Sequence, residues 1–454
     1  MKRNGILRVV ALSGLVALWA PLQPVTAQPS KDVRHITLNE AVHLALTQNH
    51  VVKIAKLKVA ENAQKKAGQR SAYFPSIKNE SNILRVTDLQ NIGIPAGAFG
   101  GAGGSLVPAQ GITIPQGQNT LFSSGTQVSQ PLTQLIRIRQ ANQIAAAEVA
   151  VSRDDLKKTE TEIALQVHTV YFGILIARLQ KQAAEQQSNY ASERLRESED
   201  DVRNGSALKV SAIQGKAGFL ESQQSVLTAQ LQLSDLNTEL NDLLGLPLDT
   251  QLDLDPAIPT SFDLRPREEY TQTAWSENPE ILAAEETVRK AKAGVIAAKS
   301  AYIPDITAFA RQSYQDGVPF LVHNFGTFGV NLTYDVFDFG KRRSGVRERE
   351  AQLAEAEENL RRLKDQVAVG IEQDYNKLER TRSMVDVASQ VVKLRQESER
   401  LAQNQLSQGV VLVSDRRQST AAMYKAQADY LQASLGYLLA WAELEQAVGR
   451  TPGL

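Results

Sequence analysis

Apolar and polar side chains alternate strictly along residues 325–339, which predicts a β-strand with one apolar face and one polar face. Residues 122–132 and 306–314 alternate less regularly and predict two further strands. A strand of a soluble sandwich would alternate in the same way, so the pattern alone does not identify the environment. In the clearest strand the apolar face holds Phe328, Val330, Leu332, Tyr334 and Val336, and the polar face holds Thr327, Gly329, Asn331, Thr333 and Asp335.

Helical periodicity dominates the stretches after the strands. Residues 141–203 and 345–406 contain no proline and almost no glycine, and each would extend roughly 95 Å as one helix at about 1.5 Å per residue. Each stretch ends at a glycine reversal, and a shorter helix is predicted to return over 210–244 or 413–448. Each half of the chain is therefore predicted to contain a helical hairpin. Apolar residues of the second long stretch follow coiled-coil spacing: Leu353, Leu360, Leu363, Val367, Ile371, Tyr375 and Leu378.

The two halves are copies of one unit. Residues 45–77 match residues 274–306 at an offset of 229, and later positions match at an offset of 204, as Gly205 matches Gly409. The difference of 25 residues indicates an insertion in the first copy, where residues 91–119 contain eight glycines and three prolines. We expect a flexible surface loop there, because glycine-rich composition without a following helix does not fit a nucleotide-binding motif.

Each copy opens with a predicted helix, over 38–70 or 267–300, that ends at an Ala-Tyr-x-Pro turn. We expect the next copy's opening helix to continue the line of the shorter return helix. The predicted organisation is a signal peptide at 1–27, a first repeat at 28–244, a linker at 245–266, a second repeat at 267–449 and a tail at 450–454.

Composition excludes several classes of function. The 50 basic and 50 acidic residues give a formal net charge of zero, so nothing indicates a nucleic-acid partner. The chain has no cysteine, which excludes disulfides, thiolate metal sites and a cysteine-linked lipid. No catalytic or cofactor motif is present, so we expect neither an enzyme nor a bound cofactor.

The N-terminus predicts export. Basic Lys2, Arg3 and Arg8 accompany an apolar stretch at 6–20, and small residues at 25–27 offer a cleavage site. No later stretch is predicted to form a transmembrane helix, residues 167–177 coming closest, so membrane insertion would require β-strands. Four strands cannot close a barrel, and an open edge cannot face lipid. Several chains must then combine their strands: two chains would give eight and three would give twelve.

The order of several motifs resembles that of the TolC-like outer membrane efflux protein family. The motifs are Ile36-Thr-Leu-Asn-Glu-Ala-Val-His-Leu-Ala-Leu46, the paired Ala-Tyr-x-Pro turns, Gln130-Pro-Leu132, the linker after Gly245, and Gly409 before Leu412 and Asp415. The resemblance covers the whole chain after the signal peptide. It implies a mainly α fold with β: long α-helical hairpins forming a periplasmic tunnel, and four strands per chain contributed to a trimeric 12-stranded outer-membrane β-barrel.

The resemblance also implies a function. The chain would be the outer-membrane channel subunit of a tripartite efflux system, a passive exit duct for small molecules, drugs or metals. Its partners would be two further copies, a periplasmic adaptor, an inner-membrane pump reached through that adaptor, and outer-membrane lipid. The alternatives are a duct of type I protein secretion, a periplasmic adaptor and a structural coiled coil. Two hairpins, each preceded by strands, disfavour the last two.

By resemblance, the hairpin reversals form the periplasmic tip and contact the adaptor. These residues are Gly205, Ser206, Ala207, Leu208, Gly409, Val410, Val411 and Leu412. A simpler interpretation, compatible with the first, is that glycine permits the turn.

Asp415 matches an aspartate that lines the pore constriction of TolC, and three copies would form an acidic ring. The alternative is a carboxylate that stabilises a helix N-terminus. Gln418 replaces the second ring aspartate of TolC, and the first copy has Ser211 at the position of Asp415. Leu406 and Val411 replace TolC's gate tyrosine and arginine, so we expect a different closing network, in which Arg416 or Arg417 substitutes.

Overall fold

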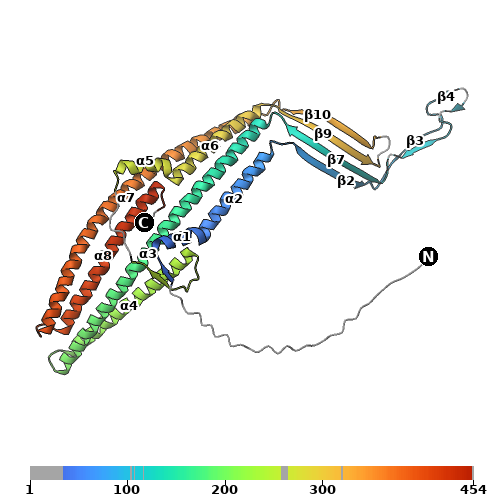
Figure 1. Cartoon of the computed structure of the whole chain (residues 1–454). Coiled ribbons are helices and arrows are strands. Elements are labelled where there is room, and N and C mark those ends of the chain that lie inside the picture. Colours follow the sequence, from blue (N-terminus) through green and yellow to red (C-terminus); the bar gives the residue numbers. More distant parts are fainter. Residues whose placement is uncertain are drawn as a thin grey trace, which may run out of the picture.

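The computed structural model describes residues 34–102, 105–106, 108–115, 117–256, 264–317 and 321–451. The predicted signal peptide, part of the linker and the last three residues lie outside these ranges. The molecule is elongated, with a helical body at one end and a four-stranded sheet at the other (Figure 1).

Each repeat contributes two neighbouring strands to this sheet. The strands are β2 (Ser76–Arg85) and β7 (Thr120–Pro131) from the first repeat, and β9 (Asp305–Asp316) and β10 (Asn324–Thr333) from the second. The order is β10-β9-β7-β2, and all neighbours are antiparallel. The sheet is open: β2 and β10 form its two edges.

The register places alternate residues of the four strands on two opposite faces. Lys78, Gln127 and Arg311 occupy one row across β2, β7 and β9, on the same face as Thr327 of β10. The adjacent row, on the opposite face, holds Ile77, Val128, Ala310 and Phe328.

The last strand is shorter than its pattern predicted. β10 ends at Thr333 instead of residue 339, although the alternation continues to Val336. Thr333 pairs with Asp305, the first residue of β9, so the next residues of the chain have no strand to pair with.

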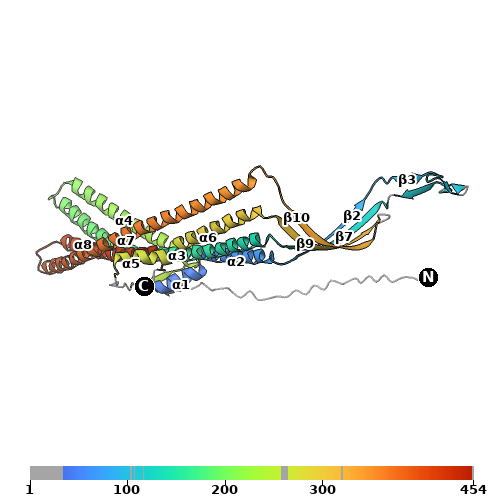
Figure 2. The ribbon, with the colours of Figure 1, turned by 90° about the horizontal axis from the view of Figure 1, so that it is seen from above.

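The glycine-rich insertion is more regular than expected. Within its described residues, β3 (Asn91–Ile94) pairs with β6 (Ile112–Pro115), and β4 (Gly101–Ala102) pairs with β5 (Ser105–Leu106). These short ladders extend beyond the end of the sheet as an arm (Figures 1 and 2). Pairing satisfies the backbone groups that a glycine-rich loop would otherwise leave to water.

The two helical hairpins are confirmed. The first is α3 (Leu135–Arg203) with α4 (Lys209–Leu244), and the second is α7 (Lys341–Ser407) with α8 (Val413–Val448). Helix α3 also packs against α8, which joins the two hairpins side by side. In the half nearer the sheet the helices lie in the order α2-α3-α6-α7, and near the tips they lie in the order α4-α3-α8-α7.

Each opening helix is broken once, where one continuous helix was predicted. The first consists of α1 (Leu38–Gln48) and α2 (His50–Ser71), and the second of α5 (Arg267–Glu277) and α6 (Pro279–Lys299), followed by a short 3₁₀ turn (Ser300–Tyr302). The breaks fall at Asn49 and Asn278, the matched asparagines of the repeat. Their side-chain oxygens accept from the backbone N–H of Val51 (2.8 Å) and Glu280 (2.9 Å), capping α2 and α6.

The same asparagines correct the predicted path of the return helices. Asn49 Nδ2 donates to the carbonyl of Leu243 at the end of α4 (3.1 Å), and Asn278 Nδ2 donates to the carbonyl of Ala447 at the end of α8 (2.8 Å). Each return helix is therefore joined to the opening helix of its own repeat, not to that of the next. An asparagine can make this junction because its amide is both donor and acceptor.

A hydrophobic core surrounds these junctions. Tyr171 of α3 is almost completely buried there, and its hydroxyl donates to the carbonyls of Asp255 (2.9 Å) and Ile36 (3.2 Å). Those carbonyls belong to, or adjoin, a small parallel ladder of β1 (Arg34–Ile36) and β8 (Leu252–Leu254). Helix α3 also contains one stretch long and apolar enough to span a membrane, contrary to expectation, but 56% of that stretch is buried against the rest of the chain, as in a core helix.

Candidate functional site

The two hairpin reversals lie at the same end of the molecule, farthest from the sheet, and diverge from each other there (Figures 1 and 2). Gly205 and Gly409 have positive φ angles of 76° and 69°. A Cβ added to either would meet nothing within 4 Å, so backbone conformation rather than space requires glycine. The turn-forming role of both glycines is thus visible in the backbone.

The residues after these glycines expose apolar side chains. Leu208 is 76% exposed, Val410 68% and Leu412 57%, whereas Ala207 and Val411 are partly covered. Ser206 is instead tied to its own turn, because its hydroxyl donates to the carbonyl of Asp201 (2.9 Å). Exposed apolar residues at the tip of a hairpin are unfavourable in water, so this surface suits a binding partner.

Asp415 is exposed in the first turn of α8, and its Oδ2 accepts from the backbone N–H of Leu412 (3.3 Å). A carboxylate at this position stabilises a helix N-terminus. The structure of the single chain therefore shows the helix-terminus role of Asp415, and its place in a ring of three stays a prediction. Gln418, one turn further on, is also exposed, and Ser211 of the first hairpin is partly covered.

Arg416 is engaged within its own hairpin. Its Nη2 lies 3.8 Å from Oε1 of Glu399 on α7, and the hydroxyl of Thr420 lies 3.4 Å from the same oxygen. This ion pair links the start of α8 to α7.

A contact that the sequence did not predict joins the two hairpins near the tip. Oε1 of Glu197, on α3, accepts from the backbone N–H of Ser414 at the start of α8 (3.2 Å). Glu197 also forms an ion pair with Arg194 (3.1 Å). The acceptor lies 217 residues from its donor and within a run of charged residues, so no local pattern distinguishes it.

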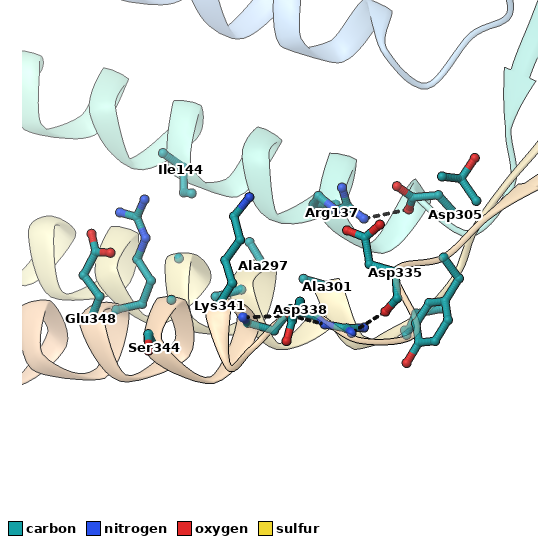
Figure 3. Close-up of a pocket in the computed structure, with 18 residues that line it drawn as sticks. Arg137, Ile144, Ala297, Ala301, Asp305, Asp335, Asp338, Lys341, Ser344 and Glu348 are labelled. Atoms are coloured by element: carbon teal, nitrogen blue, oxygen red, sulfur yellow. Dashed lines mark hydrogen bonds and ion pairs between the residues drawn. The ribbon is translucent and has the colours of Figure 1, made fainter.

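A cavity of about 850 Å³ lies where the sheet meets the helices (Figure 3). Arg137 pairs with Asp305 (2.7 Å) on one side, and Arg342 pairs with Asp338 (2.6 Å) on another. The bonds from Arg342 hold the pKa of Asp338 below its usual range. These pairs fix the start of α3 to the start of β9, and the start of α7 to the loop after β10.

The carboxylates of Asp374 on α7 and Glu443 on α8 lie near each other between the two helices. Burial, and then the nearby Glu443, raise the pKa of Asp374 to about 6. Lys377 forms an ion pair with Glu443. Among the described residues, no group of three or more potential ligands could hold a metal ion.

The geometry of paired hairpins and an open sheet agrees with comparisons against known proteins. A family model described as "Outer membrane efflux protein" matches residues 41–246 and 271–450, one segment in each repeat.

The chain belongs to the outer membrane efflux protein family.

Solved members of similar fold span nearly the whole chain. The CmeC outer membrane channel of Campylobacter jejuni superposes with a TM-score of 0.74 at 16% identity, covering 91% of this chain and 85% of that one. CusC gives a TM-score of 0.71 at 16% identity, covering 91% and 92%. The open state of the MtrE channel of Neisseria gonorrhoeae gives 0.64 at 18% identity, covering 91% and 89%.

A relative known by sequence has a different description. The alkaline protease secretion protein AprF of Pseudomonas aeruginosa is 21% identical over 312 residues, which cover 67% of this chain and 64% of that protein. The match therefore spans slightly less than two thirds of that relative's length.

Membership of the outer membrane efflux protein family confirms the predicted family, the predicted mainly helical fold with strands, and the predicted outer-membrane localisation with an extension into the periplasm.

Proposed function

We propose that three copies of this chain form a passive channel, with a 12-stranded barrel in the outer membrane and a helical tunnel across the periplasm. The observation that carries this proposal is that the chain has two open edges along its whole length. One edge is formed by β2 with the helices on its side, and the other by β10 with α7; each exposes unpaired backbone groups or apolar side chains. Because the two edges are different surfaces, copies of the chain can associate head to tail into a closed ring.

At the sheet, the open edges are β2 and β10. Among the residues that the structure describes, their outward backbone groups pair with no further strand, and they cannot remain unpaired in lipid. Pairing β10 of one chain with β2 of the next satisfies them. The face with Phe328 and Val330 would then point to lipid, and the face with Lys78 and Arg311 to the lumen, as in known membrane barrels.

Near the tips, the outer helices are α4 and α7. Both carry apolar side chains at coiled-coil spacing that are largely exposed in the single chain. They run in opposite directions, because α4 leaves the tip and α7 approaches it. The exposed residues are Ile213, Leu220, Leu227 and Leu231 on α4, and Met384, Val387, Val391 and Leu394 on α7.

Nearer the sheet, the outer helices are α2 and α7, and their charges are complementary. Counted from the helix ends nearest the sheet, Lys56 and Lys58 of α2 are at the height of Glu355 and Glu357 of α7, and Lys53 lies about one helical turn farther along. Neither Lys53 nor Glu355 has an ion-pair partner among the described residues of the chain. Contact between neighbouring chains would pair them.

The exposed apolar tips would contact a periplasmic adaptor, through which an inner-membrane pump supplies energy. The channel itself would need no catalytic site and no cofactor. Substrates would be small molecules, drugs or metals. The similarity to AprF supports a second candidate, a duct for secreted protein, built from the same three-chain channel.

Conductance tests the channel directly. Purified protein in a planar bilayer should give discrete current steps, and native mass spectrometry should give the mass of three chains. An intact oligomer without conductance would refute the channel, and a stable dimer would refute the count of three.

A charge exchange tests the interface. Lys53→Glu and Glu355→Lys should each weaken the oligomer, and the double variant should restore it. Arg361→Glu, on the exposed surface of the same helix α7, is the control for charge reversal as such. If the double variant is as weak as the single ones, the two residues do not meet.

A further inference from the structure

Three charged residues form a cluster on the polar face of the sheet. Lys78 and Glu80 lie on β2, and Arg311 lies on β9, two strands away. The other charged residue on this face of the four strands is Asp305, at the first position of β9, and it forms an ion pair with Arg137 of α3. The clearest polar strand, β10, contains no ionisable residue at all. A small cavity of about 150 Å³ is lined by Lys78, Glu80, Gly125, Gln127, Ser129 and Arg311.

The two cations share one row of the sheet. Lys78 pairs with Gln127, and Gln127 pairs with Arg311. Adjacent strands lie about 4.8 Å apart, so the two cationic positions are separated by roughly 10 Å along this row. In the proposed barrel the row continues into the neighbouring chain, and three chains place six cations around the lumen.

Gly125 shapes the position of Arg311. A Cβ added to Gly125 would lie 2.6 Å from Nη2 and 2.7 Å from Nε of Arg311. The guanidinium therefore lies directly against the glycine backbone, in space that any other residue would fill. This contact holds the charge beside the barrel wall, facing the lumen, and leaves the passage open.

The charge of the cluster is not neutralised. Within the described ranges, neither Lys78 nor Arg311 lies at ion-pair distance from a carboxylate. The proposed neighbour of β2 is β10 of the next chain, residues 324–333, which supplies no counter-charge. Glu80 offsets one of the two cations, so each chain contributes a net charge of +1 at this level.

We propose that Lys78 and Arg311 form a cationic ring inside the barrel, which favours anionic solutes over cations. This inference rests on the channel proposed above and assigns its charge selectivity. A field from the wall reaches about 10 Å at 0.1 M salt, so the ring acts on ions that pass near the wall and weakens as salt increases.

The absence of native cysteine makes the ring accessible to a direct test. Arg311→Cys removes the charge, and a cationic or an anionic methanethiosulfonate reagent then adds a chosen one. The measurement is the Cl⁻/K⁺ permeability ratio, from the reversal potential across a bilayer in a KCl gradient below about 0.1 M. Ala310→Cys is the matched control, because the adjacent residue lies on the opposite, apolar face.

Arg311→Cys should lower the permeability ratio roughly two-fold, as expected for removing three wall charges at this salt. The cationic reagent should restore the ratio and the anionic reagent should lower it further, while Ala310→Cys should respond to neither. Lys78→Gln should lower the ratio and Glu80→Gln should raise it, which provides a second test if Arg311→Cys does not assemble. If the variants conduct and their Cl⁻/K⁺ permeability ratio does not change with these charges, the cationic ring is refuted. If the wild-type protein does not conduct, the proposed channel itself is refuted.

Discussion

The paired asparagines Asn49 and Asn278 give a quantitative prediction about stability. Each side chain caps one helix through its amide oxygen and donates through its amide nitrogen to one carbonyl near the end of the return helix. Loss of a helix N-cap costs about 1 kcal/mol, and loss of a buried hydrogen bond costs about 1 kcal/mol more. Asn49→Ala and Asn278→Ala should therefore each lower the free energy of unfolding by about 2 kcal/mol.

A serine separates the two contributions. Serine caps a helix about as well as asparagine, but its hydroxyl is too short to reach the carbonyl of Leu243 or Ala447. Asn49→Ser and Asn278→Ser should lose about 1 kcal/mol each. The two sites share no hydrogen-bond partner, so the double alanine variant should lose about 4 kcal/mol.

Urea unfolding of the detergent-solubilised protein, followed by circular dichroism at 222 nm, measures these differences. The slope of the transition should stay constant, because the variants unfold the same surface. Alanine variants within about 0.3 kcal/mol of wild type would refute the junction as a source of stability. Serine variants as unstable as the alanine variants would show that the bond to the return helix, and not the cap, accounts for the loss.

Four further predictions follow from other sites. The pKa of about 6 means that charged Asp374 destabilises the fold above pH 6 and that this cost disappears as pH falls toward 4. Asp374→Asn should therefore raise the thermal unfolding midpoint at pH 7.5 and not at pH 4; an equal rise at both would refute the ionisation argument. Asp415→Ala removes a negative charge at the tip, so it should raise the Cl⁻/K⁺ permeability ratio or weaken block by cations, opposite in sign to Arg311→Cys in the barrel; no change in conductance measurements would leave only its role in α8. Tyr171→Phe removes the hydroxyl whose single proton is shared between the carbonyls of Asp255 and Ile36, and it should cost about 1–2 kcal/mol, measured by urea unfolding. Glu197→Gln should loosen the contact with Ser414 and speed hydrogen exchange at the start of α8, and unchanged exchange would rule this contact out as a restraint.

The C-terminal ends of the long helices could be predicted from the sequence to within one residue, whereas α3 and α7 begin at 135 and 341, before the predicted starts at 141 and 345. The prediction of a return helix at 413–448 matches α8 at both ends, since glycine and apolar periodicity are local signals. The repeat itself identified Asn49 and Asn278 as equivalent positions. Their function as junctions was not predictable, because a capping asparagine at the middle of a helical pattern has the same local sequence whether or not a distant carbonyl lies beside it.

The candidate site was predicted in part. Gly205 and Gly409 adopt the positive φ angles that a reversal requires, a property of the backbone that glycine signals directly. The contact between Glu197 and Ser414 was missed, as was the placement of Arg311 against Gly125. Both depend on segments that are far apart in the chain and meet only after the hairpins pack.

The sequence by itself determined the period of each element, and thereby the helices, the strands, the two-fold repeat and the family. Those properties follow from the spacing of apolar and polar side chains, which is a local property of the sequence. Only the tertiary structure decided where β10 stops, which opening helix each return helix joins, and that Lys78 and Arg311 occupy one row. Each of these depends on the register between distant segments, and register is fixed by packing and pairing rather than by any local pattern.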